Sequence, residues 1–200
     1  AFNWFRAHEP QLAHWQMEMA RIPAPPFGEA ARAAWLAERF REVGLDDVRM
    51  DDVGNVFGTH PGFGRRYIAL SAHIDTVFPA NTPLNIRQQG SRLYGPGVSD
   101  NGVGVAALLA IAALLRSVRI RHALPFVLIG NVGEEGEGDL RGMRHIFSTP
   151  RWKDSIAYSV VLDGAGELVA ITNQVNGTVT RWSQNGSVIQ SFNLSGWGSQ

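Results

Sequence analysis

The stretch "LPFVLIGNVGEEGEGDL" (residues 124–140) joins a mostly apolar run to a glycine-rich segment with two adjacent glutamates. The run from Leu124 to Val132 does not alternate with polar residues, which is typical of a strand covered on both faces within a parallel sheet. Ligands of open α/β sheets bind in the loops at the carboxyl ends of such strands. Glu134 and Glu135 therefore stand either in a solvent-exposed loop or at a site that holds a cation.

Helices and strands alternate along the chain as far as residue 164. Two N-terminal helices are expected, one opened by Pro10 and one over 29–45, followed by short strands at 47–50 and 55–60. Beyond them we expect strands at 66–75, 124–132 and 156–164, a hairpin at 83–95 turning at Gly90, a long apolar helix from Asn101 to about Ser117, and a short helix around 139–147. This alternation predicts a layered α/β fold around a largely parallel sheet.

The C-terminal segment has a different character and carries two Asn-Gly pairs, at 176–177 and 185–186. Asn-Gly favours tight hairpins because both residues tolerate positive φ. We therefore expect a three-stranded meander, which would cover the edge of the sheet either within the chain or across a homo-oligomer. The side chains expected to do so are the large apolar ones of this segment, Trp182, Ile189, Phe192 and Trp197.

The composition narrows the classes of function. The chain has 200 residues, 44% of them hydrophobic, and its 18 basic residues balance its 18 acidic residues, so neither a nucleic acid nor a membrane surface is expected as a partner. The apolar run 102–115 is shorter than the roughly 20 residues that span a bilayer, and the N-terminus lacks signal-peptide features. A cytoplasmic location is the default expectation. With no cysteine present, any metal must be held by His, Asp and Glu.

Residues of metal-ligand type stand at four strand ends and helix starts. They are His73, Asp75, Asp100, Glu134, Glu135 and Asp163. Taken singly, each has a structural explanation: a hydrogen-bonded histidine, a helix N-cap at Asp100, a turn at Asp163, a solvated loop at the glutamates. Gathered at one edge of one sheet, the carboxylates would repel one another, and a divalent cation would remove that penalty.

The set of ligand types also indicates the chemistry. Nitrogen and oxygen donors without sulfur suit Zn²⁺, Co²⁺ or Mn²⁺ in a hydrolytic site. A carboxylate can bridge two metals, and two metals can activate a water while polarising a carbonyl oxygen. That reaction needs a base that is not itself a ligand, and one of the two adjacent glutamates fits this role.

Four segments, in this order, resemble the co-catalytic zinc metallopeptidases of the aminoacylase, glutamate carboxypeptidase and acetylornithine deacetylase family. They are "SAHIDTV" (71–77), "GPGVSDNGVGVAALL" (95–109), "NVGEEGEGDLRGMR" (131–144) and "VVLDGAG" (160–166). The resemblance covers residues from about 8 to 174. It implies a phosphorylase/hydrolase-like fold, a three-layer sandwich around a largely parallel mixed sheet. It also implies zinc-dependent hydrolysis of a peptide or N-acyl amino acid by a metal-activated water, with one or two ions per chain.

The resemblance further implies a role for each matching residue. His73 and Asp163 would bind the first metal, Asp100 would bridge both metals, Glu135 would bind the second, Asp75 would orient the imidazole of His73, and Glu134 would be the general base.

The chain also departs from the family pattern. Family members continue into a lid and dimerisation domain with a Gly-His-type motif, and then supply a last metal-binding histidine, whereas no histidine follows His145 here. We therefore expect an incomplete catalytic domain over 1–174, a meander tail over 175–200 and no lid. By this pattern the second metal lacks its third protein ligand, and the spacing of His60, His122 and His145 recommends none of them as a substitute.

Three hypotheses follow. The chain is an active hydrolase in which water or another subunit replaces the missing ligand. Alternatively, it is a truncated family member that binds one metal through His73, Asp100 and Asp163 and catalyses little. In the third, it is a metal-free binding or interaction module. Intact residues at every matched position argue against the third hypothesis, and the missing histidine argues against full activity in the first.

Overall fold

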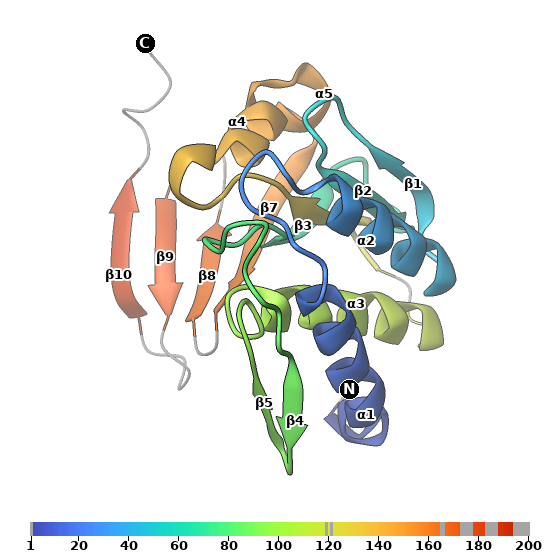
Figure 1. The fold of residues 1–200 in the computed structure, drawn as a ribbon. Helices are drawn as coiled ribbons and strands as arrows, with labels where there is room; N and C mark the ends of the chain where they lie inside the picture. The colour runs from blue at the N-terminus through green and yellow to red at the C-terminus, as the bar shows by residue number, and fades with distance from the viewer. Residues whose placement is uncertain are drawn as a thin grey trace.

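The computed structural model describes residues 2–118, 120, 122–164, 167–172, 178–182 and 188–193, shown in Figure 1. The strands of the main sheet are β1 (Asp46–Met50), β2 (Val56–His60), β3 (Tyr67–His73), β6 (Phe126–Asn131), β7 (Ile156–Asp163), β8 (Glu167–Thr172), β9 (Thr178–Trp182) and β10 (Val188–Asn193). They lie in the order β1-β2-β6-β3-β7-β8-β9-β10. The sheet is mixed, with β3 parallel to both β6 and β7 and antiparallel pairing on either side.

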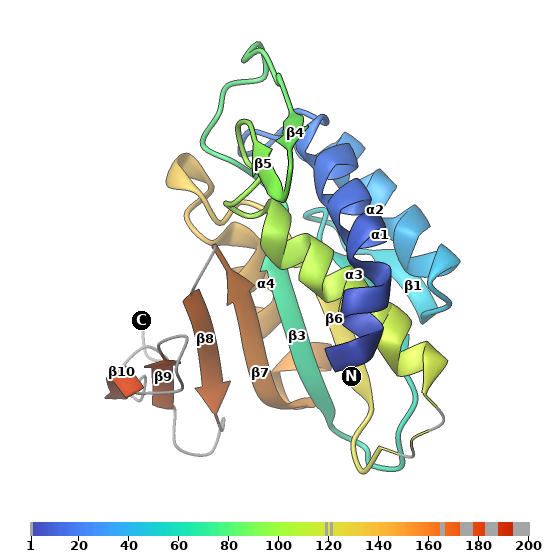
Figure 2. The ribbon, with the colours of Figure 1, turned by 90° about the horizontal axis from the view of Figure 1, so that it is seen from below.

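Helices cover both faces of this sheet. The helices α1 (Phe2–Ala20), α2 (Ala30–Glu42) and α3 (Gly102–Ser117) lie on one face, and α4 (Arg141–Ser148) lies on the other, followed by the short α5 (Pro150–Lys153). Figure 2, seen from below, shows α1, α2 and α3 together on one side of β3 and β7. The predicted three-layer α/β sandwich is confirmed. No described helix is both long and apolar enough to cross a bilayer.

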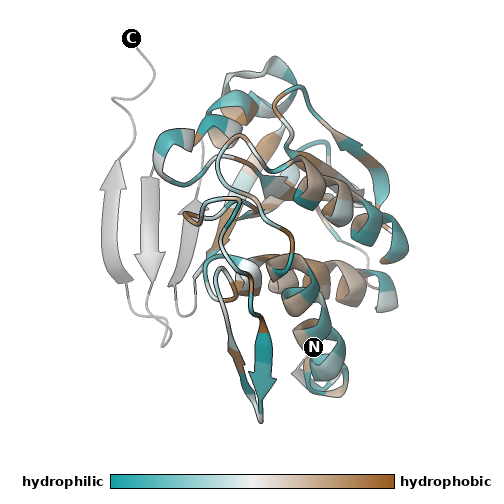
Figure 3. Ribbon diagram, in the orientation of Figure 1, coloured by the Kyte–Doolittle hydropathy of each residue, from teal (hydrophilic) through white to brown (hydrophobic). Residues whose placement is uncertain are grey.

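The largest apolar core of the described residues lies between the sheet and the helices α2 and α3. Leu36 and Phe40 of α2 and Leu108 of α3 are fully buried there. Figure 3 shows α3 as apolar along most of its length. The helix α3 packs against α1 as well as against the sheet. This explains why its own apolar residues are found on more than one face. A second core joins α4 and α5 to the opposite face of the sheet through Ile146 and Trp152.

The first helix begins earlier than the sequence predicts. Pro10 lies inside α1, which starts at Phe2, so the expectation that Pro10 opens the helix is wrong. The residues before it are held in a helical turn: the ring of His8 stacks on that of Trp4 at 3.9 Å, and its Nδ1 lies 2.7 Å from the Trp4 carbonyl oxygen. Proline costs a helix one hydrogen bond, and side-chain contacts in the preceding turn offset that loss.

The other predicted elements are present within a few residues of their expected bounds. The second helix ends before Gly44, whose φ of +82° requires glycine, and the hairpin of β4 (Arg87–Gln89) and β5 (Arg92–Tyr94) turns at Gly90 with a φ of +58°. No pattern in the sequence predicts α5. Proline at its first position is compatible with a helix start.

Three antiparallel strands, β8, β9 and β10, continue the main sheet beyond β7 in chain order. They form the predicted meander. Both Asn-Gly pairs and Trp197 lie outside the described residues, and the structure describes only the backbone of Trp182, Ile189 and Phe192. The division into a catalytic part (1–174) and a tail (175–200) stays a prediction.

Candidate metal centre

His73, the last residue of β3, lies at the centre of the candidate site. Because β3, β6 and β7 are parallel, their carboxyl ends meet at one edge of the sheet, and His73 lies in register with Asn131 at the end of β6. The imidazole is 3% exposed, and its Nε2 lies 3.0 Å from Oδ1 of Asp100 and 3.3 Å from Oδ1 of Asp163. The structure therefore brings together three predicted ligands from three separate segments.

Asp75 stabilises the candidate site through the backbone of the loop that carries Glu134 and Glu135. Its buried carboxylate accepts hydrogen bonds from the backbone N–H groups of Glu134 and Glu135, at 3.0 and 2.9 Å. The nearest partner of His73 Nδ1 is the backbone carbonyl oxygen of Asp75 at 3.2 Å, while the carboxylate lies 3.6 Å away. Asp75 thus holds the glutamate loop against the histidine. Burial alone would raise its pKa, but the interaction with His73 and the two backbone N–H groups lower it.

Asp100 projects toward His73 because its neighbour caps the following helix. Asn101 is fully buried and is the N-cap of α3, where its Oδ1 accepts a hydrogen bond from the N–H of Gly104 at 3.1 Å. The Asn101 Nδ2 donates to the carbonyl oxygen of Leu162 at 2.9 Å, next to Asp163. The capping role considered for Asp100 therefore belongs to Asn101, and the carboxylate of Asp100 remains available to a ligand.

The loop that carries Glu134 and Glu135 is anchored by an ion pair. Arg141 Nη2 lies 2.7 Å from both carboxylate oxygens of Glu29, which is 4% exposed in its side chain. The backbone N–H of Arg141 also donates to the carbonyl oxygen of Gly133, which has a φ of +60°. Through these two contacts, Arg141 joins Gly133 at the start of the loop to Glu29, the residue that precedes α2.

A buried guanidinium, that of Arg32, lies next to the end of β3. Arg32 of α2 is 1% exposed and donates to the carbonyl oxygens of Ile74, at 2.7 Å, and Ile22, at 2.6 and 3.0 Å. Burial lowers the pKa of Arg32 to about 10, against the opposing influence of Asp75. Ile74 separates His73 from Asp75, so this contact holds the chain where both residues leave the strand.

The sequence does not predict the four residues that support the site, which are Glu29, Arg32, Asn101 and Arg141. Asn101 alone had a local signal, since an asparagine directly before a helix is a favoured N-cap. The partners of Arg32 and Arg141 lie in distant segments, and no spacing along the chain predicts such contacts.

The electrostatics of the site favour positive charge. Burial by itself would lower the pKa of His73, but the carboxylates of Asp163, Asp75 and Glu134 outweigh it and raise this pKa to about 10. Burial also raises the pKa values of Glu134 and Glu135, and neighbouring carboxylates add to this effect. Carboxylates that repel one another around one imidazole are the arrangement that a divalent cation relieves.

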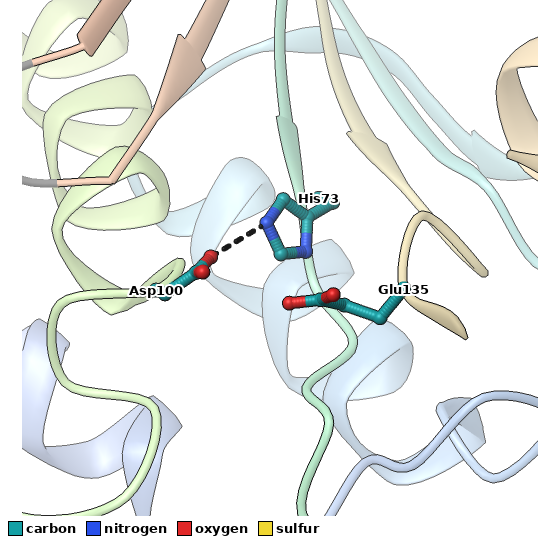
Figure 4. A group of neighbouring side chains, drawn as sticks. All are labelled: His73, Asp100 and Glu135. Atoms are coloured by element: carbon teal, nitrogen blue, oxygen red, sulfur yellow. Dashed lines mark hydrogen bonds and ion pairs between the residues drawn. The ribbon is translucent and has the colours of Figure 1, made fainter.

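The donor atoms fit such a cation. Ligand atoms of His73, Asp100 and Glu135 all lie within 4.8 Å of one another, and Figure 4 shows the two carboxylates pointing toward the imidazole. Zinc with bonds of about 2.0–2.2 Å in tetrahedral geometry separates its ligand atoms by about 3.3 Å. The distances of 3.0 and 3.3 Å from His73 Nε2 to Asp100 and Asp163 are close to that value.

The other histidines considered as ligands lie elsewhere. His60 and His122 pack against each other with ring centroids 5.3 Å apart, and Nε2 of His145 lies 3.9 Å from Asp51. None of the three belongs to the clustered donors around His73. Within the described part of the chain, His73 is thus the one histidine of this cluster.

Comparison with known proteins identifies the family. The sequence profile of peptidase family M28 matches residues 55–192, a span that includes every predicted site residue. The chain belongs to peptidase family M28. The resemblance to co-catalytic zinc peptidases predicted from the four sequence segments is confirmed.

Curated relatives of this M28 chain include peptidases and an uncharacterised protein. The uncharacterised protein YgeY of Escherichia coli K12 is 27% identical over 134 residues, 64% of this chain and 33% of that protein. Carboxypeptidase G2 of Pseudomonas sp. RS-16 is 28% identical over 117 residues, 54% of this chain and 28% of that protein. The chain thus spans about a third of the length of these relatives.

Solved structures show the same fold. The aminopeptidase PepT from Bacillus cereus has a TM-score of 0.62 at 24% identity, covering 78% of this chain and 43% of its own. A leucine aminopeptidase precursor from Bacteroides thetaiotaomicron has a TM-score of 0.57 at 20% identity, covering 84% and 63%. At these identities the comparison supports the architecture of the M28 chain and not its substrate.

Proposed function

We propose that the chain carries the metal centre of a peptidase that cleaves the amide bond of a small peptide or an N-acyl amino acid. The observation that supports this most directly is the position of His73, whose Nε2 lies 3.0 Å from Asp100 and 3.3 Å from Asp163. Zn²⁺ suits these nitrogen and oxygen donors, and Co²⁺ or Mn²⁺ would also suit them. When bound, such a cation supplies an acidified water and polarises the carbonyl group.

The residues of this chain would divide the remaining tasks. His73, Asp100 and Asp163 would hold one ion, and Asp100 and Glu135 would contact a second. Asp75 fixes the backbone of the glutamate loop through its two accepted hydrogen bonds, at 3.0 and 2.9 Å. Glu134 lines the same cavity as His73 and Asp163, and burial raises the pKa of its carboxyl group. This carboxylate would take the proton of the attacking water and deliver it to the nitrogen of the leaving amine.

A matched pair of substitutions tests this assignment. Glu134→Gln removes the base, while Glu137→Gln changes an exposed glutamate three residues further along the same loop. With dipeptides and N-acyl amino acids as substrates in added Zn²⁺ or Co²⁺, we expect Glu134→Gln to lower kcat by about 10²-fold or more and Glu137→Gln to leave it unchanged. Equal rates for both variants would refute the role of Glu134.

A second candidate is a chain that binds one ion and turns over slowly or not at all. The observation in its favour is that His73 is the one histidine among the clustered donors of the described residues. Metal analysis separates the two candidates. Two ions with turnover support the hydrolase, and one ion without turnover supports the alternative.

Association through the sheet edge or the meander stays a prediction. Light scattering at several protein concentrations tests it. A mass of two chains or more is the expected result, and a strict monomer would contradict it.

A further inference from the structure

A pocket lies at the edge of the sheet opposite to the candidate metal centre. His60, the last residue of β2, pairs with Phe126 at the start of β6, whereas His73 pairs with Asn131 at the other end of that strand. The pocket has a volume of about 320 Å³ and lies between the turn after β2, the end of α3 and the segment before β6. This volume is within the range of roughly 300–1,000 Å³ that is usual for small-molecule sites. None of its lining residues belongs to the metal centre.

Two histidine rings form a polar wall of this pocket. His60 is 7% exposed, and its ring packs against that of His122 with centroids 5.3 Å apart and an angle of 71° between the planes. Nδ1 of His60 and Nε2 of His122 are both buried, and neither has a hydrogen-bond partner among the described residues. Buried polar atoms left without a partner cost free energy. These two nitrogens therefore favour a ligand that forms hydrogen bonds with them.

A guanidinium determines the charge of that ligand. Arg116, in the last turn of α3, lines the pocket, and in the described part of the chain it has no hydrogen-bond or ion-pair partner. The lining residues include no aspartate or glutamate. A metal cation would thus meet a positive charge and no carboxylate. A carboxylate, by contrast, would pair with the guanidinium and accept hydrogen bonds from the imidazole rings.

The protonation of His60 is consistent with an anionic ligand. Burial, and then His122 and Arg116, lower the pKa of His60, and the opposing effect of Asp46 on β1 is smaller. The ring is therefore neutral at about pH 7 and keeps one N–H group that can donate. A bound carboxylate would counteract the neighbouring positive charge and raise this pKa. Anion binding and protonation of His60 therefore favour each other.

The remaining side chains of the pocket are apolar. They are Pro61, Phe63, Leu115, Val118 and Ile120. Phe63 and Ile120 are exposed, and large apolar side chains gathered at one exposed site are typical of binding surfaces. An inorganic anion would make no use of these walls. They favour an anion that also carries an apolar group.

We propose that this pocket binds a small organic carboxylate with an apolar body. The carboxylate pairs with the guanidinium of Arg116 and accepts hydrogen bonds from His60 Nδ1 and His122 Nε2, and the apolar body lies against Phe63 and Leu115. The inference does not depend on the proposed function, because the pocket and the metal centre share no residue.

Three probes test the two parts of this ligand. Hexanoate and hexanamide share an apolar body and differ in charge, and acetate has the charge without the body. The probes are titrated into the full chain in the presence of a chelator, so that no metal binds the carboxylate elsewhere, and nuclear magnetic resonance follows the ring signals of His60 and His122. We expect hexanoate to bind about tenfold or more tightly than either of the others and to raise the pKa of His60 by about 0.5 or more. Equal affinities for hexanoate and hexanamide, or for hexanoate and acetate, would overturn the proposal.

Two variants and one control locate the binding. Arg116→Gln should weaken hexanoate by about tenfold or more. Arg87→Gln, at an exposed position in the hairpin beside the start of α3, is the control and should leave the affinity unchanged (Figure 2). Phe63→Ser, also at an exposed position, should bring hexanoate and acetate closer in affinity. Unchanged binding of hexanoate in Arg116→Gln would overturn the proposal. So would ring signals of His60 and His122 that respond to Zn²⁺ and not to hexanoate, because the two rings would then hold a cation.

Discussion

The side-chain Nδ2 of Asn101 donates a hydrogen bond to the backbone carbonyl oxygen of Leu162 at 2.9 Å. The residues next to this bond, Asp100 and Asp163, both contact His73 Nε2. One buried amide therefore ties together the two segments that bring carboxylates to the histidine. Side chains that fix the position of metal ligands typically affect affinity by about 10–100-fold when they are replaced.

Asn101→Ser should separate the two tasks of this residue. Serine is a good N-cap, so α3 keeps its cap, but the shorter side chain cannot reach Leu162. We expect the affinity for Zn²⁺ to fall by about tenfold or more, with unchanged helical content in circular dichroism. Unchanged zinc affinity would show that the hydrogen bond to Leu162 does not position the carboxylates.

The ion pair between Arg141 and Glu29 should stabilise the folded chain. Glu29 is 4% exposed in its side chain, so Arg141→Met leaves a buried carboxylate without its partner. Breaking such a pair costs about 3–5 kcal/mol, which urea unfolding measures directly. The double variant Glu29→Gln with Arg141→Met should recover part of that loss, because no unpaired charge remains. A loss of under about 1 kcal/mol in the single variant, as for a surface pair, would contradict this account.

His60 should make the stability of the chain depend on pH. Burial, and then His122 and Arg116, lower the pKa of His60 in the folded chain. As the pH falls below about 6.5, the unfolded chain binds a proton at this residue before the folded chain does. The free energy of unfolding should therefore be constant with respect to His60 above that pH and decrease below it.

Urea unfolding between pH 5 and 7.5 checks this expectation. His60→Gln should flatten the decrease below about pH 6.5, whereas His8→Gln, at an exposed position on α1, should follow the parent chain. Parallel pH profiles for His60→Gln and the parent chain would show that another group is responsible.

The sequence predicts those parts of the fold whose pattern is local. The apolar runs of β3 and β6, the glycine stop after α2 and the Gly90 turn each identify their element within a few residues. The predicted start of α1 is wrong because Pro10 is typical of the first turn of a helix, whereas contacts between Trp4 and His8 accompany a helix that begins at Phe2. A local preference was outweighed by side-chain packing in the preceding turn.

The sequence predicts the donor residues of the candidate site but not the residues that hold them in position. His73, Asp100 and Asp163 come together because the parallel strands β3 and β7 end at one edge, and the order of the motifs already implies this. The contacts of Arg32 with Ile74 and of Arg141 with Glu29 join residues 42 and 112 positions apart. Nothing in the sequence near either arginine identifies its partner, so only the folded chain reveals these contacts.

The number of zinc ions bound per chain tests the central claim most directly. After dialysis against excess Zn²⁺ and removal of free metal, we expect at least one ion in the parent chain. Asp100→Ala should lose an ion, because its carboxylate is one of the three clustered donors, together with His73 and Glu135. Asp139→Ala is the control, since this exposed aspartate pairs with Arg144 outside that group, and its zinc content should match the parent. Zinc content that is absent from the parent chain, or equal in Asp100→Ala and Asp139→Ala, would contradict the assignment of this site as a metal centre.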